Sequence, residues 1–290
     1  VLAASQVSLD VTSSVSFEAK SAADYLEWDE NGYWTLTMGE YQGTPLKWRM
    51  VLKENEEETD VESVANYVET TPLQGTYYFL LDTYKANVFV CSFENNYKNS
   101  DPYPRLDEYK STVNVNDYAV SNIREYLTGT DVYRGYTNSD GNYIPSTSNV
   151  TGQTEQENFL DVFNITSSPV YNMIEGRTLS DLYSRMGGGT SGAAVTFDAD
   201  VENGVGELAG IDPDTTKDKL WLLSYYEAYK ITGSEEEDLG ARSWGTTYWL
   251  RSPSSSFTYS VYSVFASGNI GIITVPFTLC ARPAFKISIT

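Results

Sequence analysis

Short stretches of alternating or continuous apolar residues recur along this chain of 290 residues. Residues 7–20 alternate between apolar and polar side chains, which is the pattern of a β-strand with one buried face. Residues 32–54 predict two strands joined by a turn at 42–45. Residues 77–84 and 87–93 are short apolar runs, which are typical of strands buried on both faces. The pattern therefore predicts a protein rich in strands, with an edge strand near its N-terminus.

Helical spacing is clearest in residues 117–129. Val120, Ile123 and Leu127 recur at intervals of three and four residues, so they would share one face of a helix. Residues 220–231 predict a strand that leads into a second, short helix. The chain thus predicts many strands and few helices.

Four segments between these elements predict loops. Residues 129–157 and 186–219 are rich in small and polar residues, and loops of about thirty residues inside a domain are commonly functional. Residues 54–60 are acidic and predict a solvated loop, and residues 233–243 predict a surface turn. We expect the two long segments to project from the core.

Composition and charge limit the classes of partner. Aromatic residues make up 14% of the chain, including 23 Tyr and 6 Trp, which is enough to build a core. The net charge of −21 argues against nucleic acid and anionic lipid as partners. No run of about eighteen apolar residues occurs, so we expect no membrane insertion. Self-repulsion suits a soluble secreted protein, and we expect an extracellular or cell-surface location.

Several kinds of chemistry are excluded or left without support. The chain has no His, which excludes Ser-His-Asp and Cys-His systems and ordinary zinc sites. The glycine run at 187–189 is followed by no Lys and opens no predicted helix, so it predicts a flexible turn rather than a phosphate-binding loop. We expect no cofactor. Cys91 and Cys280 each lie in an apolar run; a disulfide and two buried thiols both remain open.

Calcium is the cation that the acidic loops could attract. Residues 198–204 resemble an oxygen-ligand loop, but its Gly204 comes one position late and no Glu follows at the twelfth position. Residues 138–142 are a shorter acidic segment of the same kind. We expect weak calcium binding at most, and no catalytic metal, because the chain lacks His and a paired-Cys ligand set.

Five motifs follow one another in a fixed order. They are GEYQGTPLKWRMVL at 39–52, YAVSNIREYL at 118–127, DKLWLLSYYEAYKI at 218–231, TTYWLRSP at 246–253 and CARPAFKI at 280–287. The series resembles a bacterial family of secreted and surface proteins of unknown function, which carries W-R-V-L, S-x-I-R-x-W-L, F-L-L-S-x-x-E-A, W-L-R-S-P and V-R-P-A-[FL] in this order. Met50 stands in place of the usual Val, and Tyr126 in place of the usual Trp.

The family looks like part of the C-type-lectin-like superfold, with formylglycine-generating enzymes and phage receptor-binding proteins. This resemblance implies an α+β domain over residues 31–290, with a twisted, mostly antiparallel sheet and two main helices, preceded by a strand segment at 1–30. The Glu-Pro-Asn and Trp-Asn-Asp motifs of calcium-dependent lectins are absent. Cys91 and Cys280 are far apart, unlike the closely spaced copper ligands of formylglycine-generating enzymes, so we do not expect that activity.

The motifs also predict the core. Arg251 and Arg282 could clamp a ligand, but inside core motifs we expect them to satisfy carbonyls or to pair with a carboxylate such as Glu227. The apolar members of the motifs and runs predict the following core residues: Trp48, Leu80, Phe89, Ile123, Leu127, Trp221, Leu223, Trp249, Leu250 and Phe285.

Candidate ligand-binding residues lie between the last two motifs, around a hairpin turn at 267–269. They are Phe257, Tyr259, Tyr262, Phe265 and Asn269. If Val264 and Ala266 point inward, alternation puts Phe265 outward. Aromatic residues mixed with Ser, Gly and Asn are typical of recognition surfaces, and the resemblance to phage receptor-binding proteins implies a ligand surface here. The alternative is a hairpin that packs beneath a loop.

We therefore expect a secreted or cell-surface, non-catalytic recognition module that binds a glycan or a protein. One alternative is a carboxylate-based glycan hydrolase, which needs two carboxylates about 5–10 Å apart. The other is a structural module of a larger surface protein. An apolar cleft with paired acids would favour the hydrolase, and an aromatic patch on a closed surface would favour recognition.

Overall fold

The computed structural model describes the parts of the chain that position the candidate site. These are residues 20–57, 60–83, 90–92, 118, 121–128, 136–137, 143–144, 158–177, 218–231, 239, 241–254, 260–275 and 277–290. Buried apolar residues from Leu36 to Ile289 form one hydrophobic cluster. Residues 7–19 of the strand predicted at 7–20 and most of the two long segments lie outside the described residues.

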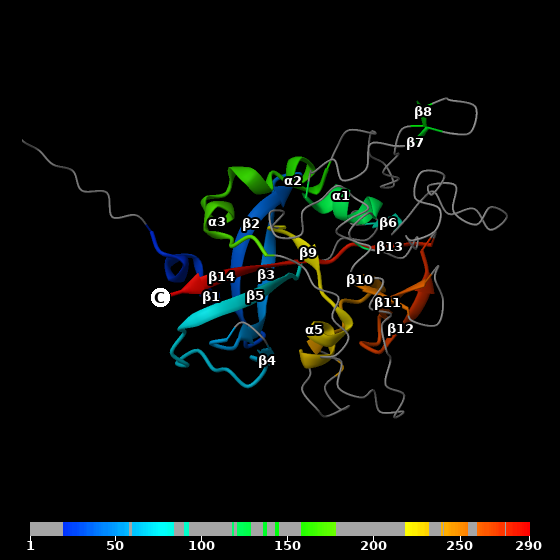
Figure 1. Cartoon of the computed structure of the whole chain (residues 1–290). Coiled ribbons are helices and arrows are strands. Elements are labelled where there is room, and N and C mark those ends of the chain that lie inside the picture. The colour runs from blue at the N-terminus through cyan, green and yellow to red at the C-terminus, as the bar shows by residue number, and fades with distance from the viewer. Residues whose placement is uncertain are drawn as a thin grey trace, which may run out of the picture.

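The first sheet joins the two ends of the described chain (Figure 1). Its strands are, in spatial order, β1 (Glu27–Trp28), β2 (Trp34–Tyr41), β3 (Thr44–Glu54), β5 (Gly75–Leu81), β14 (Pro283–Ile289) and β9 (Trp221–Leu222), with β4 (Val61–Ser63) paired to β3. Every pairing in this sheet is antiparallel. The C-terminal strand β14 lies between β5 and β9, so early and late segments depend on each other for their backbone hydrogen bonds.

The second sheet carries the predicted hairpin. Its order is β12 (Ile270–Thr274), β11 (Ser260–Val264), β10 (Tyr248–Pro253), β13 (Thr278–Cys280) and β6 (Val90–Ser92), antiparallel except for the β10–β13 pair. Cys91 and Cys280 lie on neighbouring strands, but the register pairs Cys91 with Leu279. Cys280 is a free, buried thiol.

The helices are short. They are η1 (Ala22–Tyr25), α1 (Asn122–Thr128), α2 (Phe159–Val162), η4 (Ile165–Ser167), α3 (Pro169–Met173) and α5 (Tyr225–Lys230); β7 (Tyr136–Thr137) and β8 (Tyr143–Ile144) form a small separate pair. The helices predicted within 117–129 and 220–231 are confirmed as α1 and α5. The pattern did not predict α2 and α3, because helices of one turn are too short to show a helical period.

Large aromatic residues fill the core. Trp48 meets Phe285 edge to face with ring centroids 4.9 Å apart, and Phe79 stacks on Phe285 at 5.4 Å. Trp249 is fully buried as well. The predicted core residues that the structure describes are all buried, and Phe89 lies outside the described residues.

The prediction that residues 54–60 form a solvated loop is wrong for the first of these residues. Glu54 is the last residue of β3 and is 7% exposed. Its carboxylate accepts hydrogen bonds from the Tyr78 hydroxyl at 2.8 Å and from Lys286 Nζ at 3.0 Å. An acid at the end of an apolar strand can stay inside when a cation on a neighbouring strand reaches it.

The coarse fold prediction is confirmed: the protein is mixed but rich in sheet, its strand pairs are mostly antiparallel, and its helices are few. In Figure 1, α2 and α3 lie beside the first sheet, and α5 lies close to β10 and β11 of the second. Among the residues that the structure describes, no helix is long and apolar enough to cross a membrane.

Candidate functional site

Two of the ordered motifs interlock around Glu227, which is 3% exposed. Ser224 and Glu227 form a capping box at the start of α5, with Ser224 Oγ accepting from the Glu227 backbone N–H at 3.1 Å. Arg251 Nη1 and Nη2 donate to Glu227 at 2.5 and 3.1 Å, and Arg177 Nη1 donates at 2.5 Å. Arg251 also donates to the Leu222 carbonyl at 2.8 Å. The predicted pairing of Arg251 with Glu227 is confirmed.

Glu227 is held as a permanent anion. Burial alone would raise the pKa of its carboxyl group, but Arg251 and Arg177 outweigh burial and hold the pKa well below its usual value. A general acid needs a proton that it can give up near the working pH. Glu227 therefore holds α5 against β10 and is unsuited to proton transfer.

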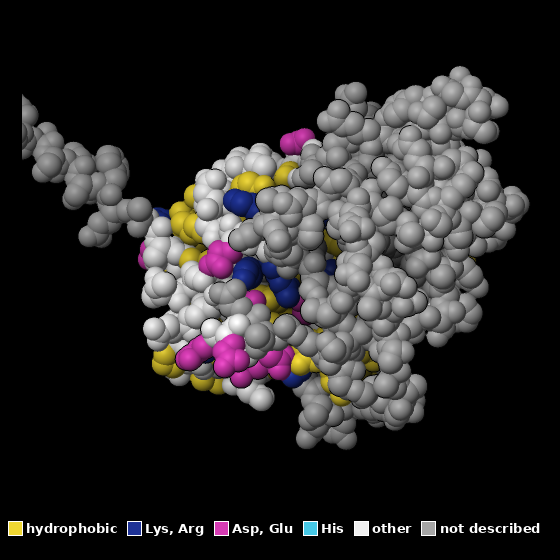
Figure 2. All heavy atoms as spheres, in the orientation of Figure 1, with side chains coloured by type: hydrophobic (Ala, Val, Ile, Leu, Met, Phe, Trp, Pro, Cys, Tyr) yellow, Lys and Arg dark blue, Asp and Glu magenta, His cyan; other side chains and the backbone are white. Residues whose placement is uncertain are grey.

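The other buried acids in the described ranges are also paired with cations. Arg124 Nε and Nη2 donate to Asp218 at 2.7 and 2.8 Å, and Lys286 holds Glu54. On the face drawn in Figure 2, Lys and Arg side chains gather near the middle of the described part, with acidic side chains beside them. Across the described residues, no group of three or more Cys, Asp or Glu is placed to hold a metal. The two segments weighed for calcium lie outside them.

Arg282 has the structural role that the sequence predicts. Its Nε donates to the Leu81 carbonyl at 2.7 Å and its Nη1 to the Arg242 carbonyl at 3.1 Å. The guanidinium also lies over the rings of Trp244 and Tyr248, at 4.9 and 5.0 Å from their centroids. Arg282 thereby fixes the backbone that leads into β10.

A group of tyrosines forms where α5 meets β11. Tyr225 and Tyr229 lie four residues apart on α5, and their rings are stacked at 6.4 Å with planes 6° apart. The Tyr225 and Tyr262 rings meet edge to face, with centroids 4.8 Å apart and planes at 69°. All three side chains are partly exposed. The structure thus brings the predicted residue Tyr262 together with two tyrosines that the prediction omitted.

Arg242 lies close enough to Tyr225 and Tyr229 for an electrostatic interaction with them. It is 5% exposed, and neither Nε nor Nη1 has a hydrogen-bond acceptor among the described residues. Burial lowers the pKa of its guanidinium, and the nearby phenols of Tyr248, Tyr225 and Tyr229 oppose this shift. Arginine stays charged in proteins, so the group is a buried cation with unused donors. We call Arg242, Tyr225, Tyr229 and Tyr262 the Arg242 cluster.

The surface turn predicted at 233–243 is therefore wrong at its C-terminal end. Ala241 and Arg242 are 6% and 5% exposed. The Arg242 carbonyl accepts from the Tyr248 hydroxyl at 2.9 Å, and Ser243 Oγ donates to the Ala266 carbonyl at 2.6 Å. These contacts bind the segment to the second sheet, and a single Arg in a turn gave no periodic signal that could reveal them.

The other described candidate residues shape the hairpin. Phe265 is partly buried and its ring covers Gly271, where a Cβ atom would lie 2.4 Å from Phe265 Cε2. Asn269 is exposed, and its Nδ2 donates to Ser267 Oγ at 3.0 Å across the turn. Phe257 and Tyr259 lie outside the described residues.

The expected alternation fails at Ala266, which is exposed. Val264 is fully buried as predicted, but β11 ends there and the chain turns, with the Gly268 N–H donating to the Phe265 carbonyl at 2.8 Å. Strand alternation no longer applies once the backbone leaves the extended conformation. Of the described candidates, Tyr262 alone joins the Arg242 cluster.

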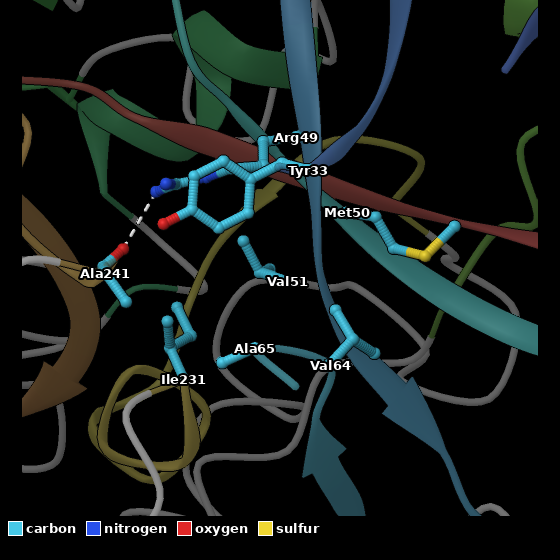
Figure 3. Close-up of a pocket in the computed structure, with 8 residues that line it drawn as sticks. All are labelled: Tyr33, Arg49, Met50, Val51, Val64, Ala65, Ile231 and Ala241. Carbon is cyan, nitrogen blue, oxygen red and sulfur yellow. Dashed lines mark hydrogen bonds between the residues drawn. The ribbon is translucent and has the colours of Figure 1, made fainter. Parts of the chain in front are cut away.

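A small pocket lies on the other side of this region, between β3, residues 64–65 and the end of α5 (Figure 3). Arg49 Nη2 donates across it to the Ala241 carbonyl at 2.8 Å, and its guanidinium lies 4.6 Å from the centroid of the Tyr33 ring. Val51 and Ile231 are among the apolar lining residues. The pocket has room for about one water molecule, which is too little for a ligand of sugar size.

Comparison with known proteins yields one match. A family model described as "Domain of unknown function (DUF6273)" matches residues 194–289. No curated protein and no solved structure matches the chain. The matched range contains the Glu227–Arg251 pair and the whole Arg242 cluster, and it supports the predicted relation to a domain family of unknown function.

Proposed function

We propose that this chain is a secreted or cell-surface, non-catalytic recognition module that binds its ligand at the Arg242 cluster. The observation that carries the proposal is the contact between the rings of three partly exposed tyrosines where α5 meets β11. Tyr and Arg are the residues that most often dominate binding energy at recognition sites. The ligand is a glycan or a protein.

The elements that carry the cluster are tied to the second sheet, which supports this proposal. The Glu227–Arg251 pair ties the start of α5 to β10, and Ser252 Oγ accepts from the Tyr225 backbone N–H at 2.9 Å. Tyr262 lies in the middle of β11, between β10 and β12. Side chains on fixed helices and strands lose little conformational entropy on binding.

The C-type-lectin-like fold, the division of the chain at residue 31 and the location outside the cell are parts of the same proposal. The five ordered motifs and the net charge of −21 support them. The hydrolase alternative has less support, because each buried acid in the described part is engaged by a cation.

A binding screen with matched variants tests the proposal. Purified protein is applied to arrays of glycans, cell-wall polymers and peptides, and affinities of the hits are measured by calorimetry. The double variant Tyr225→Ala/Tyr262→Ala should bind at least about tenfold more weakly, because it removes the aromatic faces of the cluster. Tyr171→Ala is the control, since Tyr171 is partly exposed on α3, away from the cluster.

An unchanged affinity of the folded double variant would place the site elsewhere and overturn the proposal. Release of new reducing ends from any array glycan would favour the hydrolase instead. Near-ultraviolet circular dichroism and thermal unfolding establish that each variant is folded.

A further inference from the structure

We propose that the outer edge of β12 binds residues 7–17 of a second copy of this chain, which add to the second sheet as a further strand. The inference goes beyond the proposed function, because it concerns contact between copies and not the ligand of the Arg242 cluster. It is carried by the length of this edge strand, by the uncharged segment around it, and by the strand pattern of residues 7–17.

β12 is the longest edge strand in the part of the chain that the structure describes. It lies at one end of the second sheet and pairs with β11 over five residues without a register shift. The other described edge strands have two or three residues. Among the described residues no strand pairs with the outer side of β12, so a row of backbone N–H and C=O groups faces away from β11 there. Such a row can form a hydrogen-bonded ladder with a strand from another chain.

The usual protection of an edge strand is missing from β12. Natural edge strands commonly carry charges, proline or a bulge, which prevent pairing with another chain. Residues 270–274 are Ile-Gly-Ile-Ile-Thr and have none of these features. Ile272, at the centre of the strand, is 40% exposed, and Phe277, shortly after it, is 61% exposed. Exposed apolar side chains beside an uncharged edge favour contact with another chain.

The whole segment around β12 is uncharged. Residues 252–281 contain no Asp, Glu, Lys or Arg, although these types make up 20% of the chain. Copies with a net charge of −21 repel each other over most of their surfaces. A second copy would meet no like charge from this segment, and exposed charges farther away than about 10 Å are largely screened at 0.1 M salt. Another copy can therefore approach here, provided that its own contacting segment is nearly neutral.

Residues 7–17 meet this condition. Their sequence is Val-Ser-Leu-Asp-Val-Thr-Ser-Ser-Val-Ser-Phe, in which Asp10 carries the single charge. Apolar side chains occupy every second position but one, and the segment contains neither Gly nor Pro. Tyr262 and Ile272 are opposite each other in the β11–β12 register, so they share one face of the sheet. Added beside β12, the segment can place its apolar side chains next to Ile272 on that face.

The segment is assigned to another copy because of the position of Lys20. Only residues 18–19 separate the segment from Lys20, and two extended residues span about 7 Å. Lys20 precedes η1, which contacts β14 of the first sheet. In Figure 1, η1, the blue helix near the C-terminus, and β12 lie on opposite sides of the described part. The end of the segment must stay near η1 of its own copy, so a ladder with β12 joins two copies head to tail.

Sedimentation velocity of the full chain, over a wide range of protein concentration, tests the inference. The wild type should form complexes larger than one chain as the concentration rises. Ile272→Lys places a charge on the edge, and Val11→Pro removes a backbone donor from the middle of the segment, so each should weaken association at least about tenfold. Both controls should associate like the wild type: Val68→Lys alters an exposed apolar residue elsewhere, and Ser5→Pro lies before the segment.

A mixture of the two impaired variants gives the sharpest result. Ile272→Lys keeps an intact segment and Val11→Pro keeps an intact edge. An equimolar mixture should therefore form a complex of two chains at a concentration where each variant alone is monomeric. The complex should not grow further, because its remaining edge and its remaining segment are the altered ones. A mixture that stays monomeric would overturn the inference.

Two other results would also contradict it. If Val11→Pro associates as strongly as the wild type while Ile272→Lys does not, β12 pairs with β12 of another copy and not with residues 7–17. If the wild type is monomeric at every concentration, no second copy occupies the edge. Near-ultraviolet circular dichroism establishes that each variant is folded, and none of these measurements depends on a ligand of the Arg242 cluster.

Discussion

Replacing Glu227 by Gln should destabilise the protein strongly, because it removes the anion that joins α5 to β10. The carboxylate is 3% exposed and accepts from Arg251, Arg177 and the Ser224 backbone. Gln has nearly the same shape, so no cavity forms. It loses the charge, however, and its amide places N–H donors opposite guanidinium donors.

The expected loss of unfolding free energy follows from the arginine charge that remains in the interior. Removing one partner of a buried ion pair costs about 3–5 kcal/mol, since the remaining charge stays in the interior without compensation. Here Arg251, with a side chain 2% exposed, keeps the Leu222 carbonyl as an acceptor but loses its anion. For a domain of this size, that cost corresponds to a fall in melting temperature of about 6–15 °C.

Urea unfolding followed by tryptophan fluorescence measures the loss, with Glu69→Gln as the control. Glu69 is exposed, and the same substitution there should change stability by less than about 0.5 kcal/mol. An unfolding free energy of Glu227→Gln within about 1 kcal/mol of the wild type would show that the arginines find other acceptors. The interlocking of the two motifs around Glu227 would then be no source of stability.

Two further predictions concern a glycine and the pH dependence. Gly39→Ala should lower the free energy of unfolding by several kcal/mol, and Gly43→Ala by much less. Both glycines have positive φ angles, but a Cβ atom at Gly39 would lie 2.6 Å from the Phe163 carbonyl oxygen, whereas a Cβ atom at Gly43 would have no atom within 4 Å. Equal losses in urea unfolding would refute this steric argument. The folded state lowers the pKa of Glu227 from 4.5, so the stabilisation by its carboxylate is complete above that pH and is lost as the pH falls below it. The difference in unfolding free energy between the wild type and Glu227→Gln should therefore shrink from about pH 7 to about pH 3. A constant difference would contradict the lowered pKa of Glu227.

More of the fold than of the candidate site could be predicted from the sequence. Trp48, Trp221 and Trp249 lie in short apolar runs, and such runs predict buried strands whatever their partners are. The capping box of Ser224 and Glu227 is likewise a local signal, so α5 could be located from the sequence. Sheet order could not be predicted, because β14 pairs with β5 across about 200 positions of the chain and with β9 across about 60.

The candidate site could not be predicted for a different physical reason. Tyr262 was found through composition, whereas Tyr225 and Tyr229 read as ordinary positions of a short helix until α5 is placed beside β11. Arg242 lies in a segment with charged and small residues, where a guanidinium is expected to be solvated. Its burial arises from tertiary contacts of its own carbonyl and of Ser243, and neither leaves a pattern in the sequence.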